Sequence, residues 1–309
     1  MMHILITGGT GHLGAAVVRQ LLETGADVTI LARPNSDTWR LTDVLPRLNI
    51  IHADLDNLEP AHAALAALQP EAVIHLAWQN ITADRRDEAE QITVNTTATL
   101  RLFEMVRSSC KHWIGVGSLA EYGAYNRPLT EDLPPQPVTA YGTAKYCTGL
   151  LLNKLCQING TRFVWFRMTG TYGPKDSEQH LIPYVILSLL KGEKPALTSG
   201  EQRWDYLYVE DAAAAIVKAL TNGSASGFYN LGSGVARPVR DIVTMIREQI
   251  NPALPLGLGE IPIKESPHRI TLLQADNTRF IHSVRDWQPE TSLENGLRQT
   301  VAWYRTLLF

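Results

Sequence analysis

A glycine-rich turn between a strand and a helix, close to the N-terminus, most constrains how this chain can fold. Residues 3–7 are apolar and β-branched and predict a buried parallel strand, and residues 15–23 have a helical pattern. Gly8, Gly11 and Gly14 lie between them. We assign Gly8 to the tight turn, Gly11 to close approach of the backbone to a pyrophosphate, and Gly14 to helix–strand packing. This order predicts an α/β fold with a doubly wound parallel Rossmann sheet that binds a dinucleotide.

The predicted dinucleotide site extends along this turn. The first backbone N–H groups of a helix have no partner within the helix and are free to bind phosphate oxygens. The cofactor-binding residues expected in this segment are Gly8, Thr10, Gly11, His12, Leu13 and Gly14.

The end of the second predicted strand bears on the choice of cofactor. Residues 28–32 end without the acidic residue that usually binds the ribose 2′-hydroxyl of NAD. Arg33 follows directly, and a guanidinium suits a 2′-phosphate. We therefore favour NADP over NAD, with Arg33 and Ser36 at the adenosine ribose. The alternative is that Arg33 is a solvated loop residue and the cofactor is NAD.

A second motif predicts proton transfer. Tyr141 and Lys145 are four residues apart and fall on one face of a helix, where the ammonium can stabilise a phenolate and lower the tyrosine pKa. Such a pair serves alcohol and ketone chemistry near neutral pH. Ser118 follows the predicted strand at residues 112–116, on the sheet edge where ligands bind, and its hydroxyl can stabilise charge that develops on oxygen. We predict Ser118, Tyr141 and Lys145 as the catalytic residues.

The remaining pattern alternates strands with helices. Further strands are predicted at residues 48–51, 72–77, 161–168 and 194–197, and helices at residues 59–68, 91–105, 210–220, 240–250 and 291–304. We expect a Rossmann domain at residues 1–169 and a smaller C-terminal α/β substrate-binding lobe at residues 170–309, with the chain crossing back between them.

Composition excludes several classes of function. A net charge of −3 and a pI of about 6.3 provide no basic surface for nucleic acid or an anionic membrane. No apolar run is long enough for a signal peptide or a membrane span. Cys110, Cys147 and Cys156 are scattered without the spacing of metal ligands. We expect a cytoplasmic protein with reduced thiols and no metal.

Taken together, the motifs resemble those of the extended short-chain dehydrogenase/reductase family, the NAD(P)-dependent nucleotide-sugar epimerases, dehydratases and reductases. Besides the glycine turn and the three catalytic residues, the resemblance rests on residues 172–174, 205–211 and 230–234. It covers almost the whole chain, and its motifs are specific for the family but not for the reaction. It implies a nucleotide-diphosphate sugar as substrate and a homodimer formed through two helices of each subunit, one of which carries Tyr141.

The resemblance also implies further cofactor contacts. Asp54 and Leu55 are similar to an acidic–hydrophobic pair that contacts adenine, and Asn95 to a structural hydrogen-bonding residue near the active site. The remaining cofactor-binding residues expected on this basis are Leu76, Ala77, Trp78, Tyr141, Lys145 and Thr169.

One departure from the family narrows the reaction. In its 4,6-dehydratases, the position of Ser118 is a threonine followed by acidic residues that carry out elimination, but Leu119 and Ala120 stand here and Glu121 is out of register. We therefore expect a 4-ketoreductase of a nucleotide-linked 4-keto-6-deoxyhexose, which Arg33 favours. The alternatives are an NAD-retaining epimerase, such as a 4-epimerase, and a catalytically silent cofactor-binding regulator.

The substrate contacts depart from the family as well. Trp204 stands where relatives carry an arginine that binds diphosphate, so either Arg203 reaches the phosphates or Trp204 stacks on the base or sugar. His180 replaces an asparagine and either donates to a phosphate or faces solvent, and Gly170 replaces another asparagine. The substrate-binding residues expected are Ser118, Tyr122, His180, Leu181, Arg203, Trp204 and Arg269.

Overall fold

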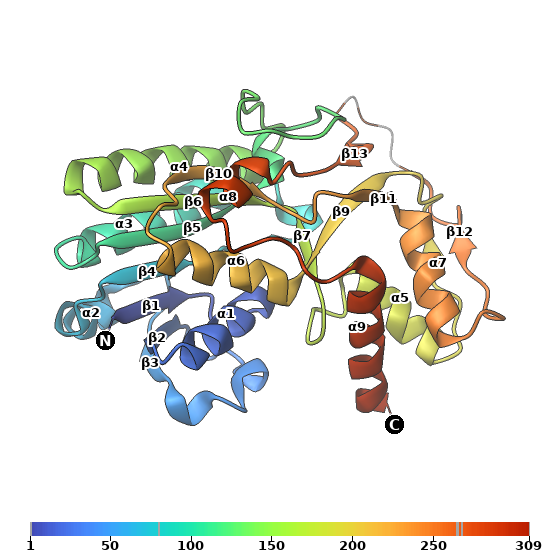
Figure 1. Ribbon diagram of the computed structural model, residues 1–309, viewed down its shortest axis with the longest axis horizontal. Coiled ribbons are helices and arrows are strands. Elements are labelled where there is room, and N and C mark those ends of the chain that lie inside the picture. Colours follow the sequence, from blue (N-terminus) through green and yellow to red (C-terminus); the bar gives the residue numbers. More distant parts are fainter. Residues whose placement is uncertain (1, 80, 264–265, 267, 309) are drawn as a thin grey trace.

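A seven-stranded parallel sheet forms the centre of the larger lobe in the computed structural model (Figure 1), which describes residues 2–79, 81–263, 266 and 268–308. The strand order is β10-β6-β5-β4-β1-β2-β3. The strands are β1 (His3–Thr7), β2 (Asp27–Ala32), β3 (Asn49–His52), β4 (Ala72–His75), β5 (His112–Ser118), β6 (Arg162–Met168) and β10 (Gly227–Leu231). This order confirms the doubly wound Rossmann sheet expected from the glycine turn.

Helices cover both faces of this sheet, which explains why its central strands are mostly buried and apolar. In β1, Ile4 and Ile6 face one core and Leu5 faces the other, as the two-residue period of a strand requires. The first core is closed by α1 (His12–Glu23), α6 (Val209–Thr221) and α8 (Thr278–Ser283), and the second by α2 (His62–Leu68), α3 (Thr97–Val106) and α4 (Ala140–Asn159).

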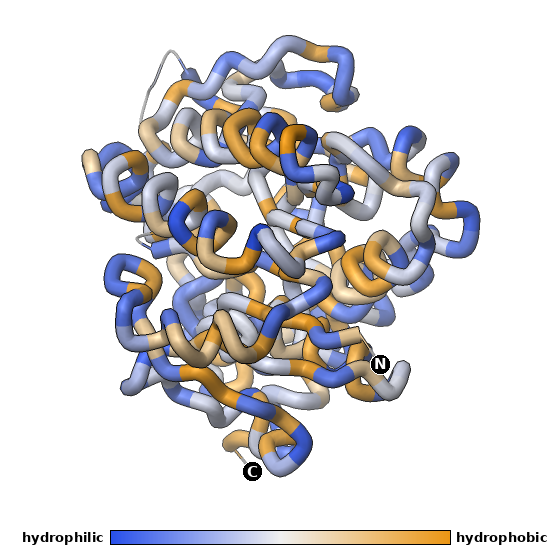
Figure 2. Tube along the Cα trace, turned by 90° about the vertical axis from the view of Figure 1, so that its left-hand side faces the viewer, coloured by the Kyte–Doolittle hydropathy of each residue, from blue (hydrophilic) through white to orange (hydrophobic). Residues whose placement is uncertain are grey.

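The smaller lobe, on the right of Figure 1, has its own sheets and core. In its four-stranded sheet β9 (Arg203–Tyr208) pairs with β7 (Gly170–Tyr172), β11 (Ala236–Pro238) and β13 (Leu272–Leu273), and β8 (Ala196–Leu197) pairs separately with β12 (Gly257–Leu258). The helices of this lobe are α5 (Leu181–Leu190), α7 (Val239–Ile250) and α9 (Leu293–Leu308). Figure 2 shows hydrophobic and hydrophilic residues alternating along the outer helices, as expected for helices that bury one face.

The chain passes between the lobes more than once. After β7 and β9 it returns to the larger lobe, where α6 packs beside α1 and β10 becomes the edge strand next to β6. Among the residues that the structure describes, no helix is both long and apolar enough to cross a membrane. The same residues contain no cluster of acidic, histidine and cysteine side chains that could hold a metal ion.

Candidate active site

The glycine turn is tightly packed where it meets the sheet and open where it faces a ligand. Gly8 has a φ of +72°, and a Cβ there would lie 2.7 Å from the backbone nitrogen of Ala77. A Cβ on Gly14 would lie 2.0 Å from the carbonyl oxygen of Gly8. A Cβ on Gly11 would meet only that same oxygen within 4 Å and would otherwise project into open space. Because no side chain caps the start of α1, its first N–H groups are available, and the turn fits a pyrophosphate.

A cavity of about 420 Å³ adjoins this turn. It is lined by most of the cofactor-binding residues predicted from the sequence, namely Gly8, Thr10, Gly11, Arg33, Ser36, Asp54, Leu55, Leu76, Ala77 and Trp78. Gln79, which was not predicted, also lines the cavity and donates to the carboxylate of Asp54 at 3.1 Å. No acidic residue follows β2 at the position of Arg33, which is exposed.

Other predicted cofactor residues lie outside this cavity and have structural contacts instead. Asn95 is buried and binds both backbone groups of Gln79, accepting from its N–H at 2.8 Å and donating to its carbonyl at 3.2 Å. The hydroxyl of Thr169 donates to the backbone carbonyl of Asp205. Leu13 packs against the core, and His12 turns toward Pro174.

The structure brings the three predicted catalytic residues together at the end of β5. Ser118 is the last residue of that strand, and its side chain is close enough to Tyr141, in the first turn of α4, to act on the pKa of the phenol. Thr139 caps this helix by accepting from the N–H of Gly142 at 3.1 Å. Lys145 lies one turn further, 4% exposed, and its Nζ donates to the carbonyl of Val116 at 2.7 Å.

The electrostatics of this group differ from the sequence-based expectation. Burial raises the pKa of Tyr141, and the hydrogen bond with Ser118 and the charge of Arg86 oppose that rise. Burial lowers the pKa of Lys145 to about 7, and its Nζ lies 3.9 Å from the centre of the Trp78 ring. Arg86 is a cation that favours a Tyr141 phenolate, and its guanidinium carbon is 5.4 Å from the phenol ring centre.

Glu121 is close in sequence to Ser118 but has a different role. It is fully buried and accepts from Nε of Arg167 at 2.8 Å and from Nε1 of Trp165 at 3.0 Å. Its carboxylate also accepts from the backbone N–H of Ser118 at 3.1 Å. With these donors in place, the carboxylate holds the end of β5 and is not free to take a proton from a sugar.

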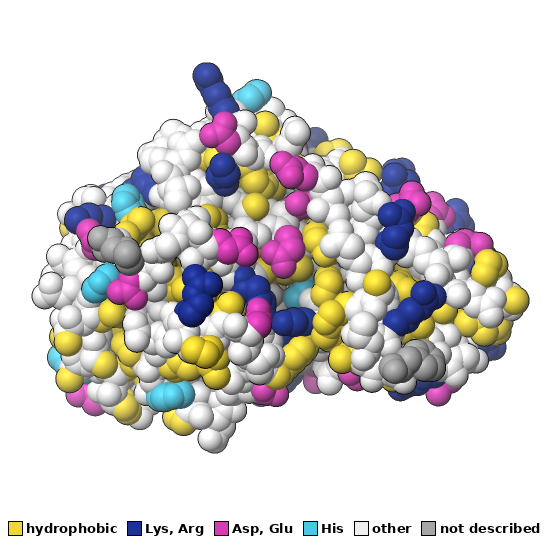
Figure 3. All heavy atoms as spheres, turned by 60° about the horizontal axis from the view of Figure 1, so that its bottom comes forward, with side chains coloured by type: hydrophobic (Ala, Val, Ile, Leu, Met, Phe, Trp, Pro, Cys, Tyr) yellow, Lys and Arg dark blue, Asp and Glu magenta, His cyan; other side chains and the backbone are white. Residues whose placement is uncertain are grey.

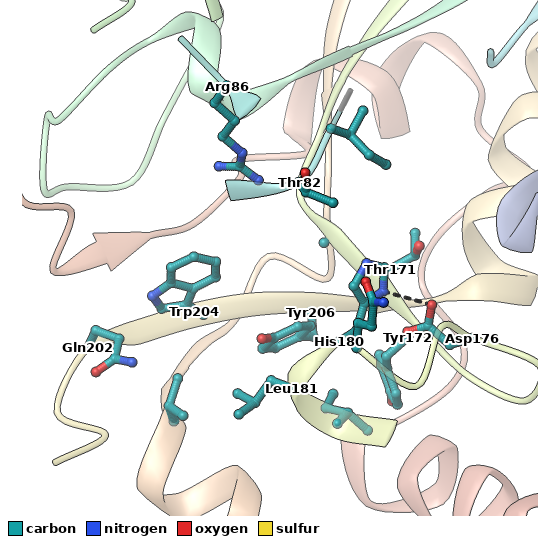
Figure 4. A pocket seen from close by; sticks show the side chains of 15 residues that line it. Thr82, Arg86, Thr171, Tyr172, Asp176, His180, Leu181, Gln202, Trp204 and Tyr206 are labelled. Atoms are coloured by element: carbon teal, nitrogen blue, oxygen red, sulfur yellow. Dashed lines mark hydrogen bonds and ion pairs between the residues drawn. The ribbon is translucent and has the colours of Figure 1, made fainter. Parts of the chain in front are cut away.

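A second cavity of about 590 Å³ lies between the loop after β4 and the smaller lobe (Figure 4). In Figure 4, Arg86 points into it from the loop, opposite Trp204 and Tyr206 of β9, while His180 and Leu181 enter from the start of α5. The rings of Trp204 and Tyr206 stack with centres 6.5 Å apart. The indole nitrogen of Trp204 is buried and has no hydrogen-bond partner among the described residues.

Four predicted substrate residues do not line this cavity, and one of them is Ser118 at the end of β5. Arg203 and Trp204 are neighbours on one strand and point to opposite faces, so Arg203 donates to the carbonyl of Ala236 instead. Tyr122 is fully buried and its hydroxyl donates to Asn230 at 2.8 Å. Arg269 lies outside the cavity's lining as well.

The structure adds residues that the sequence did not single out. Arg86, Thr82 and Asp176 line the larger cavity, although they come from loops without a recognisable motif. Figure 3 shows Lys and Arg side chains gathered near the middle of one face of the molecule. A smaller cavity of about 150 Å³ is lined by Arg19, Arg40, Lys175 and His12 of the glycine turn, among others.

Comparisons with known proteins agree with this arrangement. Residues 4–232 match the model of the NAD dependent epimerase/dehydratase family. The dTDP-glucose 4,6-dehydratase of Salmonella typhimurium is 28% identical over 342 residues, which cover 98% of this chain and 92% of the dehydratase. The corresponding enzyme of Haemophilus influenzae is 26% identical and is covered over 98% of both chains.

Solved structures show the same fold over the whole length. The UDP-glucose 4-epimerase of Thermotoga maritima, with UDP-glucose, superimposes with a TM-score of 0.88 at 25% identity and 100% coverage of both chains. The UDP-N-acetylglucosamine 4-epimerase of Methanobrevibacter ruminantium, in complex with UDP-N-acetylmuramic acid, has a TM-score of 0.88 at 25% identity and 99% coverage of both chains.

Proposed function

The chain belongs to the NAD dependent epimerase/dehydratase family, and from that membership we propose that it oxidises and reduces a nucleotide-linked sugar at C4. The observation that carries this proposal is the placement of Ser118, at the end of β5, beside Tyr141 and the buried Lys145 of α4, with no free acid next to them. These groups supply proton transfer to and from an oxygen, which is what alcohol–ketone interconversion requires.

Dehydration is the family reaction that this site supports least. Elimination needs an acid or base beside the reacting sugar, and Leu119 and Ala120 have no ionisable group. Glu121 is engaged by Arg167 and Trp165. The chain is similar to dTDP-glucose 4,6-dehydratases over nearly all its length, but the residues that would perform the elimination are missing at these positions.

Each residue of the site has a specific task in the proposed reaction. Tyr141 exchanges a proton with the oxygen on C4, and the Ser118 hydroxyl donates to the same oxygen. Lys145 leaves the carbonyl of Val116 to hold the ribose of the cofactor, and the glycine turn holds its pyrophosphate. When bound, the nicotinamide supplies hydride transfer. The stacked rings of Trp204 and Tyr206 provide an apolar surface for the base or sugar of the nucleotide.

Within this chemistry we favour a 4-epimerase that retains NAD. The family model is one of NAD-dependent enzymes, and the two solved epimerases described above superimpose over the entire chain. The NADP preference expected from Arg33 has no support from these comparisons. An NADP-dependent 4-ketoreductase is the second candidate, because Arg33 and Ser36 line the first cavity and no carboxylate follows β2 at that point.

One experiment separates these candidates. Native mass spectrometry of the purified protein would detect a retained cofactor, and NMR would identify products formed from UDP-glucose, UDP-N-acetylglucosamine and dTDP-glucose. An epimerase retains NAD and produces the C4 epimer without net consumption of cofactor. Consumption of NADPH with a 4-keto-sugar indicates the reductase. A 4-keto-6-deoxy product formed from dTDP-glucose would contradict both.

We also propose that the protein is a homodimer formed through α3 and α4. Leu150, Leu151 and Ile158 on α4 are 43%, 46% and 72% exposed, which leaves an apolar stripe on the helix that carries Tyr141. A second copy of this helix would cover the stripe.

A further inference from the structure

One buried carboxylate connects the glycine turn to the larger cavity. Asp176 is 2% exposed, and its Oδ1 accepts from the ring of His180 at 2.9 Å and from the backbone N–H of Ser177 at 2.7 Å. The same oxygen lies 3.3 Å from Nδ1 of His12, the first residue of α1. Two imidazoles, one at the cofactor turn and one in the lining of the larger cavity, thus share one acceptor.

The hydrogen-bond partners of His12 show which of its ring nitrogens carry a hydrogen. The carbonyl oxygen of Pro174 can only accept, so Nε2 of His12, 3.2 Å away, carries a hydrogen. Its Nδ1 faces the carboxylate, which is an acceptor while Asp176 is ionised. A doubly protonated His12 satisfies both contacts, and it then competes with His180 for the charge of Asp176.

His180 has a free nitrogen on the side of the cavity. Its Nδ1 is bound by Asp176 (Figure 4), whereas its Nε2 has no partner among the residues that the structure describes. The side chain is 57% exposed and lines the cavity together with Trp204 and Tyr206. Neither Arg203 nor Arg269 lines this cavity, so His180 and Arg86 are its cationic groups among the described lining residues.

The charges around this bridge favour a proton on His180. The hydrogen bond with Asp176 raises the pKa of His180, while burial lowers the pKa of His12 against the attraction of the same carboxylate. Arg40 opposes protonation of both rings. The other titratable groups that face Asp176 are Tyr206 of β9 and Tyr304 of α9, with Glu178 beside Tyr304.

We propose that Asp176 is a positioning residue that holds His180 with its Nε2–H toward the diphosphate of the nucleotide sugar, and that His12 weakens this bond by competing for the same carboxylate. The inference rests on the proposed nucleotide-sugar substrate. It makes binding of the nucleotide sugar dependent on pH, because a protonated His180 forms a charge-assisted hydrogen bond with an anion and a neutral one does not. It also makes the pH dependence of nucleotide-sugar binding sensitive to His12 in the cofactor turn.

The test is the affinity for UDP-glucose and dTDP-glucose across pH, measured by calorimetry with full-length protein saturated with NAD. The Tyr141→Phe background prevents turnover, and the diphosphate diester of either probe does not titrate near neutral pH. The affinity should fall as pH rises through the pKa of His180. Asp176→Asn should move this fall to lower pH. At pH values between the His180 pKa of the variant and that of the parent protein, where only the parent has a charged His180, the variant should bind about tenfold more weakly. His12→Gln should move it to higher pH.

Two further variants complete the design. His180→Asn should still bind the probe but lose the pH dependence. Asp43→Asn is the matched control, because Asp43 pairs with Arg19 and lies 3.8 Å from Lys175 but touches neither histidine, and its profile should equal that of the parent. NMR titration of the imidazole signals should show a lower pKa for His180 in Asp176→Asn without any ligand.

The outcomes are decisive in either direction. A flat pH profile in the parent protein, or a profile unaffected by both His12→Gln and Asp176→Asn, would overturn the inference. If thermal denaturation shows that the Asp176→Asn variant is not folded, the pH profiles of His12→Gln and His180→Asn still test the inference. If neither nucleotide sugar binds at any pH, the proposed function fails and the inference fails with it, whereas tight but pH-independent binding refutes the inference alone.

Discussion

Glu121 and Arg167 form an ion pair inside the larger lobe, with Oε2 and Nε 2.8 Å apart and side chains 0% and 5% exposed. The same carboxylate accepts from the backbone N–H of Ser118, so this pair positions the strand end that presents the hydroxyl proposed to act on the sugar. An acid that is close in sequence to the reacting groups thus serves the architecture of the site rather than its chemistry.

Replacing Glu121 with glutamine should therefore reduce stability before anything else. Removal of one partner leaves a buried charge uncompensated, which costs about 3–5 kcal/mol in the free energy of unfolding. Urea denaturation measures this loss. The matched control is Glu71→Gln, which breaks an exposed pair with Lys111 and should leave the stability nearly unchanged. Equal effects of the two substitutions would contradict the structural role of Glu121.

Tyr141→Phe should abolish turnover while leaving cofactor binding intact. The phenol hydroxyl is the group that exchanges a proton with the sugar, and loss of such a group reduces rates about 10²- to 10⁴-fold. Steady-state kinetics on the substrate identified by the product analysis, together with fluorescence titration of NAD, measure the two effects. A variant with normal turnover would refute the assigned mechanism.

Arg86→Gln should shift the pH dependence of sugar oxidation. The guanidinium of Arg86 favours the Tyr141 phenolate, so its loss raises the pKa of Tyr141 further. Because oxidation requires the deprotonated form, the rising limb of the pH–rate profile moves to higher pH and the rate at neutral pH falls. Single-turnover reduction of the bound nicotinamide measures this shift.

Arg85→Gln serves as the matched control for Arg86. Arg85 pairs with Glu88 at 2.8 Å and does not line the larger cavity. The pH profile of this variant should coincide with that of the parent protein, and identical shifts in both variants would refute the specific role of Arg86.

Gly14→Ala should disrupt the cofactor turn. Its Cβ would lie 2.0 Å from the carbonyl oxygen of Gly8, so the backbone must move, at a cost of about 1–3 kcal/mol. Calorimetric NAD binding and thermal denaturation should both show a loss. Gly223→Ala, where a Cβ meets nothing within 4 Å, should leave both unchanged.

Leu151→Glu tests the proposed dimer. Leu151 is 46% exposed on α4, and a carboxylate there would be buried without a partner in a helix-to-helix interface. Light scattering after gel filtration should show a monomer. Leu258→Glu, at an apolar residue on β12 that is 39% exposed, should retain the parent's state of association.

Much of the fold, and the placement of Ser118 beside Tyr141, could be predicted because their determinants are local. The order of strand, glycine turn and helix defines the first unit of the sheet, and Gly8 and Gly14 have backbone contacts that a side chain would block. Ser118 and Tyr141 were predictable because a strand end and a helix start on the carboxyl edge of a parallel sheet must approach each other.

The rest depends on tertiary placement that no short motif records. Arg86 and Asp176 belong to irregular loops, and only the packing of the two lobes brings them into one cavity. Tyr122 follows a strand end, but its side chain is buried in the core. Arg203 does not reach the larger cavity because Trp204, the next residue on the strand, faces it instead. Alternation along a strand separates two neighbours, but their sequence does not reveal which one faces inward.

The return of β10 to the sheet of the larger lobe has a consequence for folding and for truncation. A fragment that stops before Gly227 would leave β6 with unpaired backbone groups along one side and would uncover Phe166 and Trp165, a template for association with other chains. Residues 227–231 are thus needed to complete a sheet whose first strand is residues 3–7. During synthesis the sheet of the larger lobe cannot be completed until β10 has been made. Because the chain passes between the two lobes, we expect one cooperative unfolding transition rather than separate unfolding of each lobe.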